Sequence, residues 1–84
     1  MEIHELALGY IEALGGEANI DFIEGCVTRL RGTLIDSKKV NARKLRQLGA
    51  VGRPMIMGKG IQVVVGTYAE LIGSEMNKIM QGET

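Results

Sequence analysis

Residues 25–35 have the sequence Gly-Cys-Val-Thr-Arg-Leu-Arg-Gly-Thr-Leu-Ile, in which polar and apolar side chains alternate along the second half. Successive side chains of a β-strand point to opposite faces, so the alternation predicts a strand over residues 28–35. It places Arg29, Arg31 and Thr33 on one face and Leu30, Gly32 and Leu34 on the other. Residues 19–23 are compatible with a preceding strand. Gly25, which tolerates positive φ, is expected at the turn of this hairpin, with Cys26 in an exposed loop.

The segments on either side of this predicted hairpin have helical patterns. Apolar residues three and four positions apart predict a helix over residues 3–14, which Gly15-Gly16 would end. After the hairpin, Asn41 is a typical N-cap for a short basic helix that runs to Leu48. The hairpin is therefore flanked in sequence by two helices.

The last third of the chain predicts a second hairpin and a third helix. Two apolar runs, residues 55–57 and 61–66, are separated by the glycine-rich turn 58–60. Thr67 and Glu70 are spaced as a capping box that opens a helix. The predicted apolar face of that helix consists of Tyr68, Leu71, Ile72, Met76, Ile79 and Met80.

The order helix, hairpin, helix, hairpin, helix predicts an α+β fold. We expect a four-stranded, mainly antiparallel sheet with three helices packed on one face, a two-layer sandwich. With 84 residues, 45% of them apolar, the chain supports one hydrophobic core, so residues 1–84 are expected to form a single domain. The other face of the sheet is left to solvent, and Arg29 and Arg31 would both lie on it.

The formal net charge of zero is a cancellation between segments. Residues 1–24 contain six acids and no Lys or Arg, whereas residues 29–59 contain nine of the ten cations and one acid. A single Cys and a single His exclude an internal disulfide and a zinc site. The apolar runs are too short for a membrane span or a signal peptide. A soluble, cytoplasmic chain without a metal or cofactor is expected.

The thiol and the two guanidinium groups of residues 26–31 suggest phosphoryl chemistry. Nearby cations stabilise a thiolate, which is the nucleophilic form of Cys26. Arg29 and Arg31 could bind phosphoryl oxygens through their planar forks, so the segment could accept a phosphoryl group. Spacing alone also allows a buried core cysteine beside a solvated strand face. A phosphatase loop fits less well, because it requires Arg where Gly32 stands.

The run Cys26-Val27-Thr28-Arg29-Leu30-Arg31 resembles the hallmark of one family, a Cys followed by an aliphatic residue and Thr-Arg-Leu-Arg. The family is the glucose/sucrose/N-acetylglucosamine type of IIB domain in the phosphoenolpyruvate-dependent sugar phosphotransferase system. The resemblance covers residues 19 to about 80. Further matches, in order, are Asn19-Ile20, Asp36, Lys44-Leu45, Leu48-Gly49-Ala50, Gln62-Val63 and Gly66.

The resemblance implies a phosphorylation cycle. Cys26 would take a phosphoryl group from a phosphohistidine of a IIA partner and pass it to a sugar bound by a membrane IIC domain. Arg29 and Arg31 would act at the transfer site, and Val27 and Thr28 would form a phosphoryl-binding loop whose backbone N–H groups bind the anion. The chain would then work at the inner face of the membrane when docked on IIC.

Two other functions remain open from the sequence. One is a regulatory or interaction domain of the same fold that no longer passes phosphate to sugar. The other is a nucleic-acid-binding module, suggested by the cationic middle segment. Zero net charge and only three aromatic residues argue against nucleic acid as a partner.

Overall fold

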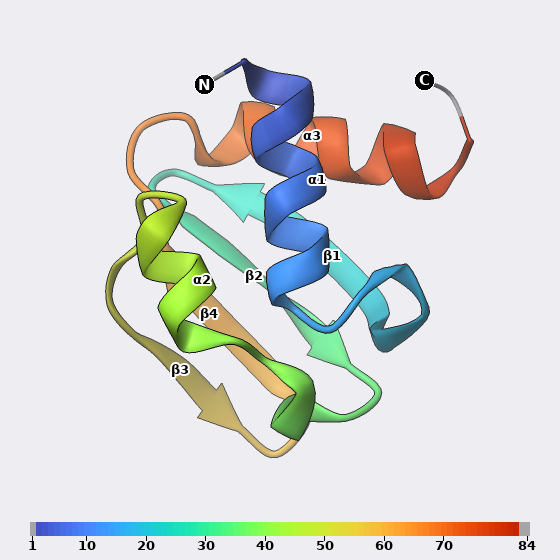
Figure 1. Cartoon of the computed structure of the whole chain (residues 1–84), viewed down its shortest axis with the longest axis vertical. Helices are drawn as coiled ribbons and strands as arrows, with labels where there is room; N and C mark the ends of the chain where they lie inside the picture. Colours follow the sequence, from blue (N-terminus) through green and yellow to red (C-terminus); the bar gives the residue numbers. More distant parts are fainter. Residues whose placement is uncertain (1, 83–84) are drawn as a thin grey trace.

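The computed structural model describes residues 2–82 and confirms the predicted α+β fold (Figure 1). The expected domain of residues 1–84 thus includes residues 1 and 83–84, which lie outside the described residues. Two one-turn 3-10 helices, Glu17–Asn19 and Ser37–Lys39, supplement the main elements. These are α1 (Ile3–Ala13), β1 (Ile20–Cys26), β2 (Arg29–Leu34), α2 (Ala42–Gln47), β3 (Val51–Met57), β4 (Gly60–Val64) and α3 (Ala69–Met80).

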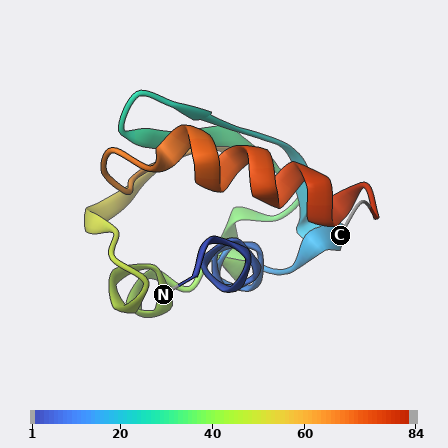
Figure 2. The same ribbon diagram turned by 90° about the horizontal axis from the view of Figure 1, so that it is seen from above.

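The four strands form one antiparallel sheet in the order β1-β2-β4-β3. All three α-helices lie on the same side of this sheet, and the opposite face is open (Figures 1 and 2). The alternation in β2 is confirmed, since Leu30 and Leu34 are buried while Arg29, Arg31 and Thr33 are exposed. Between residues 2 and 82, no helix is long and apolar enough to cross a membrane.

The core between sheet and helices is almost wholly aliphatic, as the composition predicts. Its largest fully buried side chains are Tyr10, Leu14, Ile23, Leu30, Leu34, Leu45, Ile72 and Met76. The predicted N-cap of α2 is confirmed, because Asn41 Oδ1 accepts a hydrogen bond from the Lys44 N–H at 3.0 Å. Gly49 follows α2 with a φ of 113°, the left-handed conformation that ends a helix.

The first hairpin turns later than the sequence predicts. Gly25 does not form the turn; it lies inside β1 and pairs with Leu30. The loop consists of Val27 and Thr28, between the last pair Cys26 and Arg29. Gly25 is needed for another reason. A Cβ at this position would overlap the carbonyl oxygen of Ala69, so glycine lets the backbone of α3 pack directly on β1.

The start and the buried face of α3 also differ from the prediction. The capping box is wrong, because Tyr68 is the N-cap residue and no side chain caps the helix. Tyr68 and Leu71 are 63% and 59% exposed and do not belong to the buried face. The face consists of Ala69, Ile72, Gly73 and Met76, with Ile79 and Met80 partly buried beside it. Small residues are buried here because α3 lies so close to β1.

The second hairpin is confirmed with modified ends. Its strands turn through Gly58-Lys59, and Met57 pairs with Gly60. β3 begins at Val51, earlier than predicted, because Val51 also pairs with Val64 of β4. The register between the two strands is irregular from Val51 to Met55. β4 ends at Val64, earlier than the predicted residue 66.

A buried amide fixes the end of α1 to the end of β2. Asn19 is 3% exposed, and its Nδ2 donates to the carbonyl oxygens of Leu14 and Asp36 at 2.8 and 2.9 Å. Its Oδ1 accepts from the Asp36 N–H at 2.9 Å. One side chain therefore satisfies three backbone groups at the junction of the first helix and the first hairpin.

Asn19→Ala is expected to lower the free energy of unfolding by about 2–4 kcal/mol, because it leaves buried backbone groups without partners. Urea unfolding would measure the change. The matched control is Asn41→Ala, which removes only an exposed helix cap and is expected to cost about 1 kcal/mol. Equal losses for the two variants would contradict the importance of the buried amide.

Candidate functional site

The open face of the sheet brings the thiol and the two predicted arginines together. Cys26 pairs with Arg29, and Glu24 pairs with Arg31, across the antiparallel strands β1 and β2. Side chains of directly opposed residues lie on the same face of a sheet, with Cβ atoms about 5 Å apart. The register therefore places Cys26 opposite Arg29 on one face of the sheet, with Arg31 in the next pair on that face.

All five predicted site residues line one shallow pocket of about 300 Å³. The pocket is formed by Cys26, Val27, Thr28, Arg29, Arg31 and Gln62. Cys26 is a free, exposed thiol, so the alternative of a buried core cysteine is wrong. The structure brings these residues together, and their chemical roles remain a prediction.

Two polar side chains hold the arginines in place. Arg31 Nε donates to Glu24 Oε2 at 2.6 Å, and this bond raises the pKa of Arg31 above its usual value. The charge of Cys26 acts on Arg31 in the same direction but less strongly than Glu24. Arg29 Nη1 donates to Gln62 Oε1 on β4 at 3.2 Å. Both guanidinium groups are thus hydrogen-bonded to side chains of the neighbouring strands.

The loop between the two strands has a strained backbone. Val27 has a φ of 57°, the left-handed region that β-branched residues rarely adopt. Its N–H points to Glu70 Oε2 at 3.4 Å, at the start of α3. The carbonyl oxygen of Thr28 accepts from the N–H groups of Val65 and Gly66 at 2.8 and 3.1 Å. Contacts from two other segments therefore hold the loop in a conformation that is unfavourable by itself.

Sequence reasoning missed three residues of this site: Glu24, Gln62 and Glu70. Glu24 lies two positions before Cys26 and shares its face, which follows once β1 is extended to Cys26. The sequence pattern places Gln62 only in the predicted last strand and Glu70 only in the predicted capping box. Their roles depend on strand order and on the packing of α3, which local patterns do not reveal.

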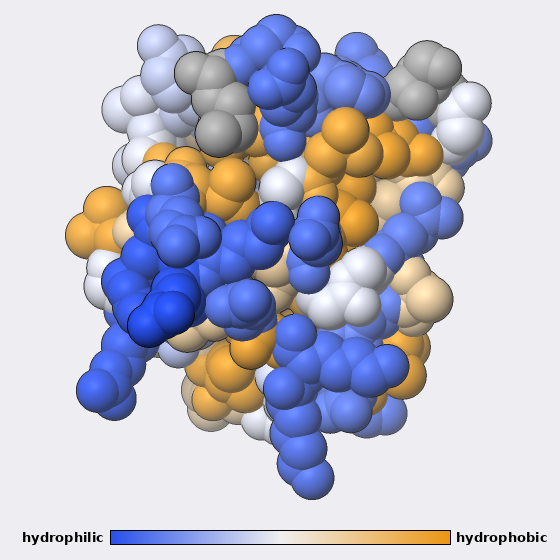
Figure 3. All heavy atoms as spheres, viewed as in Figure 1, coloured by the Kyte–Doolittle hydropathy of each residue, from blue (hydrophilic) through white to orange (hydrophobic). Residues whose placement is uncertain are grey.

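The cationic middle segment does not form one surface. Arg29 and Arg31 lie on the open face, whereas Arg43, Lys44 and Arg46 belong to α2 on the helical side. Figure 3 shows hydrophilic side chains gathered over α2 on that side. The site itself combines an exposed thiol with two fixed guanidinium groups, an arrangement that suits a transferable anionic group. Within residues 2–82, no cluster of three or more His, Cys, Asp or Glu could hold a metal ion.

Comparison with known proteins points to one family. A family model described as "phosphotransferase system, EIIB" matches residues 9–41. The "PTS system N-acetylglucosamine-specific EIICBA component" of Klebsiella pneumoniae is 47% identical over 76 residues, which are 90% of this chain and 12% of that protein. The protein of the same name in Escherichia coli (strain K12) is 45% identical over 76 residues, with the same coverage. The chain thus spans about an eighth of the length of these curated relatives.

The fold is similar to a solved structure of the same system. It is described as the crystal structure of one domain of the PTS system, IIabc component from Clostridium difficile. The two chains superpose with a TM-score of 0.69 at 25% sequence identity, over 95% of this chain and 80% of the other. The likeness extends beyond the segment that the family model matches.

Proposed function

Because the chain belongs to the EIIB family of the phosphotransferase system, of the glucose and N-acetylglucosamine type, we propose that Cys26 carries the phosphoryl group which this sugar phosphotransfer domain passes on. The observation that supports this most is the strand register. It sets the exposed thiol opposite Arg29 and in one pocket with Arg31. Three of the six pocket residues, Val27, Thr28 and Gln62, complete the surroundings of the thiol.

The proposed cycle has two substitutions at phosphorus. In the first, the thiolate Sγ of Cys26, having lost its proton to solvent, attacks the phosphorus of a phosphohistidine on a IIA partner. The S–P bond forms as the P–N bond breaks, and the electron pair stays on the imidazole nitrogen. In the second, a sugar hydroxyl oxygen attacks the phosphorus, the electron pair of the S–P bond returns to Sγ, and the hydroxyl proton leaves to a base.

Arg29 and Arg31 would stabilise the phosphoryl group while it is transferred. A guanidinium group can donate two parallel hydrogen bonds to phosphoryl oxygens, and its charge offsets the charge that spreads over them. The N–H groups of the loop formed by Val27 and Thr28 would supply backbone donors.

The partners are proposed from the family and from the openness of the site. The relatives carry the name EIICBA component, and an EIIB domain of this kind works together with IIA and IIC components. Cys26 is exposed on an open sheet face, where a IIA donor and a IIC domain with bound sugar could approach in turn. The chain would act on the cytoplasmic side of the membrane, docked on IIC during transfer to sugar.

Reconstituted sugar phosphorylation tests the proposal. Phosphoenolpyruvate, enzyme I, HPr and a IIA protein would be combined with membranes that contain a IIC domain lacking its own IIB. N-acetylglucosamine phosphate, or glucose phosphate in a parallel assay, is expected to form only when this chain is added. A phosphorylated chain that donates to neither sugar would favour the regulatory alternative, and a chain that never accepts a phosphoryl group would contradict the proposal.

Arg29→Lys and Arg31→Lys are each expected to slow phosphoryl transfer by about 10²-fold, because Lys keeps the charge but loses the planar pair of donors. Rapid-quench measurement of transfer from phosphorylated IIA would give the rates. Arg46→Lys, an exposed change on α2, is the matched control and is expected to leave the rate unchanged. If both site variants transferred as fast as this control, charge alone would explain the function of the two arginines.

A further inference from the structure

Two carboxylates occupy hydrogen-bond donors beside the thiol. Glu24 Oε2 accepts from Arg31 Nε at 2.6 Å, and Glu70 Oε2 accepts from the backbone N–H of Val27 at 3.4 Å. Arg31 and Val27 both line the pocket that contains Cys26. Two of the donors that a phosphoryl group on Sγ could use are therefore already paired with carboxylates.

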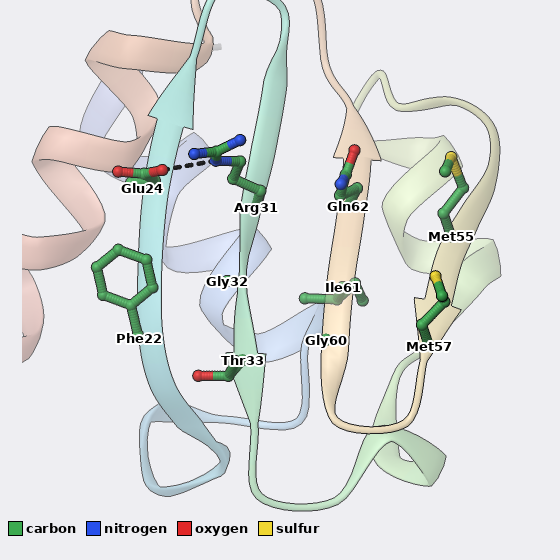
Figure 4. Close-up of a pocket in the computed structure, with 10 residues that line it drawn as sticks. All are labelled: Phe22, Glu24, Arg31, Gly32, Thr33, Met55, Met57, Gly60, Ile61 and Gln62. Atoms are coloured by element: carbon green, nitrogen blue, oxygen red, sulfur yellow. Dashed lines mark hydrogen bonds and ion pairs between the residues drawn. The ribbon is translucent and has the colours of Figure 1, made fainter.

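Glu24 is fixed on the same face as the thiol by the register of the sheet. It lies directly opposite Arg31, two residues before Cys26 on β1. Figure 4 shows the two side chains extending toward each other above the open face. Glu24 and Arg31 remain partly exposed, with 40% and 53% of their side-chain surfaces accessible, so each can adopt another rotamer without disturbing the core.

Glu70 reaches the loop because α3 packs against β1 without side chains between them. Gly25 of β1 faces the backbone of Ala69, and Gly73 of α3 faces the backbone of Gly25. This contact brings the first turn of α3 beside the end of β1, where Cys26 and Val27 lie. Glu70 is an acidic residue in the first turn of α3, a position where helices commonly carry a carboxylate.

Phosphorylation of Cys26 would place a second anion beside these carboxylates. A phosphorylated side chain carries a charge of about −1.5 to −2 at neutral pH and strong acceptor oxygens. Glu24 and the charge of Cys26 already act on the same cation, since both raise the pKa of Arg31. The phosphoryl group and the carboxylates would therefore compete for Arg31 Nε and the Val27 N–H, and they would repel each other.

Building on the proposed phosphocysteine, we propose that Glu24 and Glu70 are positioning residues that hold these two donors when the thiol is free and release them when it is phosphorylated. The competition raises the free energy of the phosphorylated state relative to the free thiol. The phosphoryl group consequently leaves Cys26 more readily for the next acceptor. The two glutamates thereby set the transfer potential of the site without touching the reacting atoms.

Partition of the phosphoryl group between two proteins measures this effect. Purified phosphorylated IIA is mixed with an equal amount of the chain, and intact-mass spectrometry gives the phosphorylated fraction of each at equilibrium. Glu24→Gln and Glu70→Gln are each expected to shift the equilibrium constant toward phosphorylated Cys26 by about two- to fivefold. The shift should shrink as salt is added, because exposed charges are screened.

Controls separate competition from a structural effect. Glu24→Asp keeps the charge and is expected to restore the wild-type partition. Glu12→Gln removes a different exposed ion pair, that of Glu12 Oε1 with Lys44 Nζ at 3.3 Å, and is expected to leave the partition unchanged. A merely structural role would lower the stability of the variants without moving the partition toward Cys26.

A second readout does not depend on IIA. Inorganic phosphate is titrated into ¹⁵N-labelled chain, and tighter binding is expected for Glu24→Gln and Glu70→Gln, with shifts at the Arg31 Nε–H and Val27 N–H signals. If both variants had the partition and the phosphate affinity of the wild type, this inference would be overturned, and the proposed function would still stand. Failure of the wild-type chain to accept any phosphoryl group would instead overturn the proposed function on which it rests.

Discussion

Cys26→Ser is expected to abolish phosphoryl transfer through this chain, with a loss of more than about 10³-fold in rate. A serine hydroxyl stays protonated at neutral pH and is a far weaker nucleophile than a thiolate beside cations. The two guanidinium groups would remain in place, because Cys26 contributes no buried contact to the core. Transfer from phosphorylated IIA, followed by intact-mass spectrometry, measures the loss.

Thermal unfolding supplies the control for this variant. Because Cys26 is exposed at the end of β1, Cys26→Ser is expected to unfold at nearly the same temperature as the wild type. An active Cys26→Ser variant would show that another residue carries the phosphoryl group. Loss of transfer combined with a collapse of stability would show that the cysteine is structural after all.

Gly73→Ala is expected to lower the free energy of unfolding by about 2–3 kcal/mol, which corresponds to a melting temperature lower by roughly 10–20 °C. A Cβ at Gly73 would overlap the backbone nitrogen of Gly25, and rigid backbone cannot move away as a side chain can. The loss is notable because Gly→Ala in a helix normally stabilises by up to about 1 kcal/mol. Calorimetry would measure it.

Ser74→Ala is the matched control, since Ser74 is the next residue of α3 and is exposed. It is expected to be neutral or slightly stabilising. If Gly73→Ala were as stable as Ser74→Ala, the direct packing of α3 on β1 would be contradicted.

The elements of this fold were predictable where the pattern is local. The alternation around Arg29 and Arg31 depends only on the two-residue period of a strand, and it correctly put both arginines on the open face. The predicted position of the first turn is wrong, because the sequence pattern favours positive φ at Gly25. Val27 adopts that conformation instead, held there by Glu70 and by the contacts of Thr28 with the segment after β4.

The clustering of Cys26, Arg29 and Arg31 was predictable from the sequence, but the residues that contact them were not. Cys26, Arg29 and Arg31 are close in sequence, so a single strand turn brings them together. Glu70 is 43 positions from its partner Val27, and Gln62 is 33 positions from Arg29. Such contacts depend on the strand order and on the glycine contact between α3 and β1, neither of which has a local sequence pattern.

The most direct test of the central claim is to locate the phosphoryl group on the wild-type chain. After incubation with phosphorylated IIA, peptide mapping by mass spectrometry is expected to find one phosphoryl group on the peptide that contains Cys26. Cys26 should then resist alkylation by iodoacetamide until the S–P bond is hydrolysed. A phosphoryl group on His4, the only histidine, or a Cys26 that is alkylated as fast as in the untreated chain, would contradict the phosphocysteine.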